Sequence, residues 1–125
     1  MNLEYLAEGL RDCPLIRLYG FNQAEARSLK NLVRSLATGE RDSAQLRDET
    51  WIESVGGCRL SLRRGMRNQA VREIEPFNFE YVLTSSGWSN VEGLLDPFCN
   101  SQAAGFQWLT NEGRVSLLIS QDGHW

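Results

Sequence analysis

The sequence contains no apolar run longer than three residues, so it lacks the ~20-residue apolar segment that a membrane-spanning helix requires. The first five residues, Met1 to Tyr5, also lack the basic start and the apolar stretch of a secretory signal. We therefore expect a cytoplasmic protein with no membrane partner.

Histidine and cysteine are also scarce. The single histidine, His124, is the penultimate residue, where a frayed chain end would not hold an imidazole rigidly enough for a catalytic triad or a zinc site. The three cysteines, Cys13, Cys58 and Cys99, are widely spaced and form no Cys-x-x-Cys pair, so we expect reduced thiols with structural roles. The sequence thus predicts no catalytic residue, no metal site and no cofactor. It favours a non-enzyme, with carboxylate catalysis from separate strands as the remaining enzymatic alternative.

The chain has 125 residues, of which 42% are hydrophobic, and this is enough for one core without disulfides or metal. We expect a single α+β domain over residues 1–125. Its predicted architecture is an antiparallel sheet of five to six strands with two main helices on one face. The predicted order is β-α-β-β-β-α-β-β, and a short helix over residues 3–10 is possible.

The clearest predicted element is a helix that begins after Asn22 and ends at Gly39, because Asn22 and Glu25 match a capping box. Apolar residues recur along it at helical spacing. A second helix is predicted from a capping box at 89–92 to Pro97. The remaining expectations are strands over 15–19 and 77–83, hairpins over 51–64 and 106–120, and an exposed connection over 40–49.

The first predicted hairpin turns at Gly56-Gly57, which sets Glu53 opposite Leu60. Because a carboxylate does not belong among apolar neighbours, we expect a bulge at the glycines to turn Glu53 outward. In the second hairpin the alternation predicts one shared face for Phe106, Trp108, Val115, Leu117 and Ile119.

Arginine is concentrated in one block. Between residues 58 and 72 there are five basic residues and no acid, although the net charge of the chain is -3; the five are Arg59, Arg63, Arg64, Arg67 and Arg72. Guanidinium groups suit phosphate, so one interpretation is a surface for phosphorylated ligands or single-stranded nucleic acid. The interpretation that we favour is cross-strand pairing with the acids Glu73, Glu75 and Glu80.

Two further features bear on binding. Four tryptophans are many for this length, and we select Trp108 and Trp125 as candidate interface residues. Trp125, the last residue, is either free or docked onto the domain. The segment Thr84-Ser85-Ser86-Gly87 fits a helix cap better than an anion site, because it lacks the spacing of a phosphate loop.

From the first long helix onward, the predicted order of helix, hairpin, strand, helix and hairpin is similar to that of small acidic secretion chaperones. The chain differs from them by the added strand over 15–19 and by the missing final helix. The resemblance implies a dimer that binds an extended partner. We therefore expect a protein-interaction or regulatory module that binds a protein or self-associates, with Arg59, Arg63, Arg64, Arg67, Trp108 and Trp125 as candidate binding residues. The alternative is a binder of phosphate or single-stranded nucleic acid through the Arg59–Arg72 block.

Overall fold

The structure is a computed structural model, and it describes residues 1–9, 11–100 and 105–125. The fold is α+β, as expected. The helices are α1 (Gln23–Thr38), α2 (Ser85–Leu95) and the short 3-10 helices η1 (Leu46–Asp48) and η2 (Asp96–Cys99). The strands are β1 (Asn2–Leu6), β2 (Leu15–Tyr19), β3 (Ser43–Gln45), β4 (Glu53–Val55), β5 (Arg59–Arg64), β6 (Arg72–Glu75), β7 (Asn78–Leu83), β8 (Phe106–Thr110) and β9 (Ser116–Ser120).

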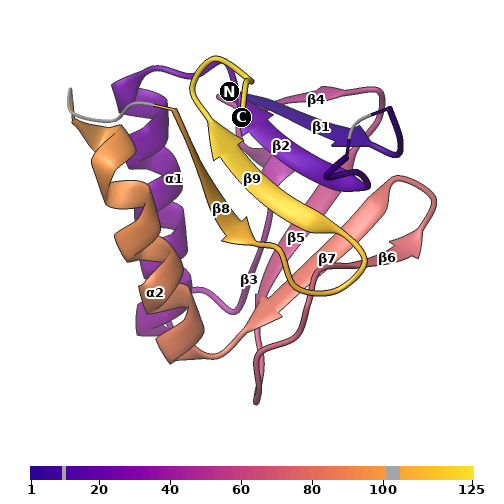
Figure 1. Cartoon of the computed structure of the whole chain (residues 1–125). Coiled ribbons are helices and arrows are strands. Elements are labelled where there is room, and N and C mark those ends of the chain that lie inside the picture. The colour runs from indigo at the N-terminus through magenta and orange to yellow at the C-terminus, as the bar shows by residue number, and fades with distance from the viewer. Residues whose placement is uncertain (10, 101–104) are drawn as a thin grey trace.

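The strands form two sheets instead of the single antiparallel sheet that the sequence predicted. The five-stranded sheet has the order β4-β1-β2-β9-β8 and the four-stranded sheet has the order β3-β5-β7-β6. Both sheets are mixed, because β1 and β4, β2 and β9, and β5 and β7 pair in parallel. The two long helices lie side by side at one side of the molecule, next to both sheets (Figure 1).

The predicted first helix is confirmed as α1. The Asn22 side chain accepts a hydrogen bond from the Glu25 amide and the Glu25 carboxylate accepts one from the Asn22 amide, which completes the capping box. Gly39 ends the helix in the left-handed conformation at φ 88°. The apolar stripe faces the core; its buried residues are Ala26, Leu29, Leu32, Val33 and Leu36.

The possible N-terminal helix is wrong, since residues 2–6 form β1. Leu3 is fully buried, and β1 pairs antiparallel with β2 and parallel with β4. The Met1 ammonium donates to Glu25 Oε2 at 2.7 Å and to the Trp51 carbonyl at 2.9 Å, which ties this strand to α1. Strand pairing on both sides outweighs the weak helical spacing of the segment. Leu10, part of that spacing, lies outside the described residues.

The predicted hairpin at Gly56-Gly57 is also wrong. Both glycines have positive φ, 66° and 78°, but the chain uses this turn to pass from one sheet to the other. β4 pairs with β1, whereas β5 pairs with β3 and β7. Glu53 therefore never opposes Leu60, and it points outward without the expected bulge.

Three local features also differ from the sequence-based prediction. The connection over 40–49 contains β3 and η1, which bury Ala44 and Leu46. The exposed edge strand β6 was not predicted at all. α2 begins four residues before the predicted cap at Ser89, because the Thr84 hydroxyl accepts a hydrogen bond from the Gly87 amide.

The last hairpin is confirmed as β8 and β9, but its faces differ from the prediction. A bulge between Trp108 and Thr110 shifts the register, so that Trp108 pairs with Leu118 and Thr110 with Leu117. Trp108 consequently does not share a face with Leu117. Leu109 is the β8 residue that joins the core.

We expect Leu36→Ala to lower the free energy of unfolding by about 2–5 kcal/mol, because Leu36 is fully buried in the α1 stripe. Arg34→Ala on the exposed side of the same helix removes a 2.9 Å ion pair with Glu92 and should cost less than about 1 kcal/mol. Urea titration of both variants checks this. Equal losses would contradict the assigned orientation of α1.

Candidate functional site

Two members of the arginine block meet at one acid on the outer side of the four-stranded sheet. Arg63 Nη1 lies 2.9 Å from Glu80 Oε2, and Arg72 Nη2 lies 3.2 Å from Glu80 Oε1. Glu80 is only 7% exposed. Hydrogen bonds from Arg63 and then from Arg72 hold the pKa of the Glu80 carboxyl below its usual value, against the opposing effect of burial.

The other arginines do not join this pair. Arg64 donates to Ser85 Oγ at 2.7 Å, which links β5 to the start of α2. Arg59 lies beside Gln45, Arg47 and Asn78 at a cavity of about 220 Å³, and Arg67 is exposed in the loop after β5. Of the three acids expected to pair with the block, Glu80 does so. Glu73 instead accepts a hydrogen bond from the Phe77 amide.

The cysteines and the histidine lie apart from one another. Cys58 is buried in the core as predicted, and burial raises the pKa of its thiol to about 12. All three cysteines are free, and Cys99 Sγ donates to the Leu95 carbonyl. Within residues 1–9, 11–100 and 105–125, no group of three His, Cys, Asp or Glu is placed to hold a metal ion.

The end of the chain is docked, which answers the question left open for Trp125. Its indole Nε1 donates to Asp12 Oδ2 at 3.0 Å, and the His124 carbonyl accepts a hydrogen bond from Ser120 Oγ at 2.6 Å. Arg17 Nη1 also donates to the Gly123 carbonyl. The ring of Trp125 is half-buried, and its side chain holds the terminus against the loop between β1 and β2.

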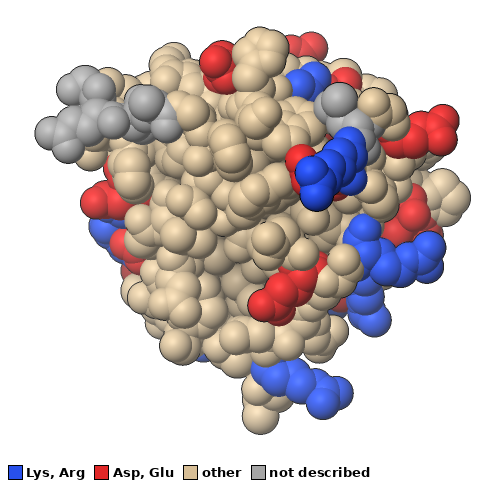
Figure 2. All heavy atoms as spheres, viewed as in Figure 1, with Lys and Arg blue, Asp and Glu red and all other residues tan. Residues whose placement is uncertain are grey.

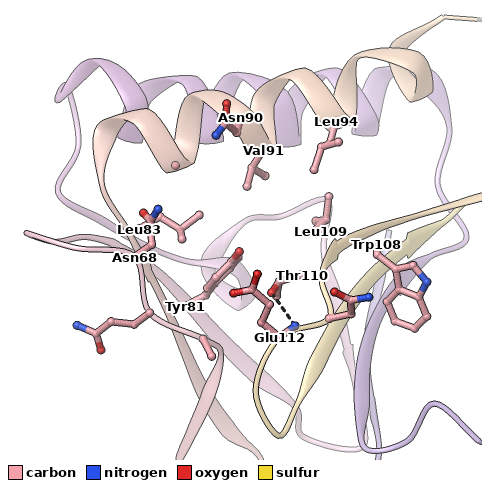
Figure 3. Close-up of a pocket in the computed structure, with 14 residues that line it drawn as sticks. Asn68, Tyr81, Leu83, Asn90, Val91, Leu94, Trp108, Leu109, Thr110 and Glu112 are labelled. Atoms are coloured by element: carbon pink, nitrogen blue, oxygen red, sulfur yellow. Dashed lines mark hydrogen bonds between the residues drawn. The ribbon is translucent and has the colours of Figure 1, made fainter.

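Trp108, by contrast, lines a groove with a volume of about 310 Å³ between α2 and β8. The floor of the groove is apolar and consists of Tyr81, Leu83, Val91, Leu94 and Leu109. Its rim is polar and includes Asn68, Gln69, Asn90, Asn111 and Glu112. In Figure 3, Val91 and Leu94 project from α2 towards Leu109, and the Glu112 carboxylate and the Tyr81 hydroxyl lie at the centre of the groove.

Close approaches at Gly87, which lines the groove, and at Gly113, which follows Glu112, hold together the segments that form this groove. Asn68 Oδ1 accepts hydrogen bonds from the amide and the hydroxyl of Thr84, so the loop after β5 is tied to the cap of α2. A Cβ at Gly87 would lie 2.5 Å from Asn68 Oδ1, and a Cβ at Gly113 would lie 2.6 Å from Ala70 Cβ. Larger residues at either glycine would push the walls apart.

Glu112 is the one charged residue among the described residues that line the groove. Its amide donates to Thr110 Oγ1, which fixes the turn after β8. Burial raises the pKa of Tyr81, a hydrogen bond with the Thr110 side chain partly offsets this, and the Glu112 carboxylate raises it further. The centre of the groove is therefore negative, with an apolar floor below it and a tryptophan at its side.

The groove runs along a strand edge, since β8 is the last strand of its sheet among the described residues. The other sheet edges are protected: β3 and β4 have three residues each, and β6 is charged at three of its four positions. β8 has five residues and no charge, and its exposed Phe106 ring meets Trp108 edge to face at 6.2 Å. Figure 2 shows that the surface over α2, β8 and β9 carries few charged side chains.

Comparison of the chain with family models, with curated proteins and with solved structures gave no significant match. None of the helices in the described part of the chain is long and apolar enough to cross a membrane. The function must therefore be inferred from the surface of this molecule alone.

Of the candidate binding residues, only Trp108 lies at the groove. Sequence reasoning missed Glu112, because a single acid in a turn is ordinary. It also missed Asn68 and Tyr81, because nothing local indicates that the loop after β5 and strand β7 meet α2 and β8. One signal was present: Phe106 to Thr110 is an uncharged aromatic strand next to the acid.

We expect Glu80→Gln to lower the free energy of unfolding by about 1–2 kcal/mol at pH 7, because it weakens two charge-assisted hydrogen bonds. The folded-state pKa of Glu80 lies below its ordinary value of 4.5. The stabilisation is thus fully present above the unfolded pKa and is lost as the pH falls through the folded pKa.

Urea titrations from neutral to acidic pH check this prediction. Wild type and Glu80→Gln should differ at neutral pH and converge in acid. Glu40→Gln makes the same chemical change at an exposed position and should match wild type throughout. A difference that persists unchanged in acid would contradict the assignment to these ion pairs.

Proposed function

We propose that the protein is a non-enzymatic interaction module that binds an extended peptide segment in the groove between α2 and β8. The segment carries a lysine or arginine whose aliphatic stem lies against Val91, Leu94 and Trp108 and whose charge meets Glu112. The observation that carries this proposal is the position of one carboxylate in a groove with an apolar floor and a polar rim, beside the edge strand β8.

The groove can accommodate both parts of a long basic side chain, the aliphatic stem and the charged end. Long basic side chains bury their stems on apolar surface and keep the charge at a polar end. The floor side chains offer the apolar surface, and Glu112 together with the amide oxygens of Asn90 and Asn111 offers acceptors.

The strand edge supplies the second source of affinity. An extended segment beside β8 pairs with its outward backbone groups, as in other strand-addition complexes. The Gln107 side chain donates to the Trp108 carbonyl at 2.9 Å, and this side chain can turn away when a peptide binds. Backbone pairing gives affinity, whereas the pocket at Glu112 gives selectivity.

We favour an external segment over a second copy of this chain because of charge. Between Arg72 and Arg114 the sequence has no basic residue, so β8 of a second copy brings no cation of its own to Glu112. The phosphate and nucleic-acid alternative has less support. Glu80 already engages the guanidinium groups of Arg63 and Arg72, which lowers the positive charge available to a phosphate.

A display library of random decapeptides selected against the wild-type protein tests the proposal. We expect enriched peptides with a lysine or arginine among apolar and β-branched residues. Glu112→Gln should weaken the best peptide by about tenfold or more, since it removes a charge-assisted hydrogen bond. Trp108→Ala should weaken it as well, and Glu40→Gln should leave the affinity unchanged.

Two outcomes would contradict this function. One is a selection that returns no peptide, or peptides whose affinity is the same for wild type and Glu112→Gln. The other is a dimer seen by light scattering that is lost on substitution at Trp108, because then a second copy occupies the β8 edge.

A further inference from the structure

A further, shallow and open cavity of about 520 Å³ lies at the far end of the four-stranded sheet, where the turn between β6 and β7 approaches β1. Its walls are Tyr5, Ala7, Ile74, Pro76 and Phe77 together with the carboxylate-bearing side chains of Glu73 and Glu75. Both charged residues in this lining are acids. None of these residues belongs to the groove at Glu112.

Two aromatic rings bound the cavity at an angle. The rings of Tyr5 and Phe77 meet edge to face, with centroids 6.0 Å apart and planes inclined by 75°. Phe79 covers Tyr5 from the core side at 4.6 Å. Phe77 remains 49% exposed, so part of its ring is open to a ligand.

The backbone holds Phe77 in a conformation that a phenylalanine rarely adopts. Its φ is 63°, the left-handed region, and no other described residue except glycine has a positive φ. The Phe77 amide donates to Glu73 Oε2 at 3.1 Å, and its carbonyl accepts a hydrogen bond from the Arg59 amide at 2.8 Å. These bonds keep the ring beside Tyr5 and a carboxylate beside both rings.

We propose that this cavity binds an organic cation, such as an alkylammonium or quaternary ammonium group, against the rings of Tyr5 and Phe77 and the carboxylates of Glu73 and Glu75. The negative faces of aromatic rings attract cations, and the apolar shell of a methylated ammonium fits the surface of Ile74 and Pro76. Burial and then the Glu73 carboxylate raise the pKa of Tyr5, and the smaller effect of Arg114 lowers it, so the negative charge has the larger effect at this ring.

Tetramethylammonium chloride is the probe for this site, and tert-butanol is its neutral counterpart of similar shape. Amide chemical shifts of the wild-type protein are followed by NMR at constant ionic strength. We expect saturable shifts at Tyr5 and over residues 73–78 with tetramethylammonium, and no saturation with tert-butanol. Shifts that never saturate, or the same response to both probes, would overturn the proposal.

Three variants locate the site. Glu73→Gln keeps an acceptor for the Phe77 amide but removes the charge, and it should weaken binding by about threefold or more. Phe77→Gly suits the positive φ and should remove saturable binding without unfolding the chain. If the glycine variant does not fold, Phe77→Asn replaces it in this test, because asparagine also tolerates this conformation. Glu40→Gln should bind as wild type does. Unchanged affinity in both the Glu73 and Phe77 variants would refute the site.

Discussion

Burial of the apolar stripe of α1 is the interaction on which the rest of the structure depends. Leu29 and Val33 of this helix line a small apolar void at the centre of the molecule, together with residues of α2 and of both sheets. The void is about 10 Å³, too small for a ligand, so the elements meet there in close packing. Without this apolar stripe, the two sheets would lack the helix surface against which both of them pack.

The floor of the groove at Glu112 is formed by side chains of that same core. Tyr81, Val91 and Leu109 line both the central void and the groove, so one layer of side chains forms the core on one side and the binding surface on the other. Ion pairs link α1 to α2 through Arg34 and Glu92 and to the start of η2 through Lys30 and Asp96. The groove is therefore pre-organised by the core, and a ligand need not order it.

The parts of the fold that local sequence determines could be predicted. The capping box and the apolar stripe identified α1, and alternating residues identified β7, β8 and β9. Pairing between distant segments could not be predicted in this way. Gly56-Gly57 fits a hairpin turn by its residues, but β4 pairs with β1, which lies 51 residues earlier in the chain. Likewise, Glu112 acquires its place in the groove only because α2 and the loop at Asn68 surround it.

Amide hydrogen exchange of β8, with and without a saturating selected peptide, tests the central claim most directly. If the peptide adds a strand to this edge, the backbone amides of β8 that point away from β9 exchange more slowly in the complex. Protection confined to other parts of the chain, with β8 unchanged, would contradict the account.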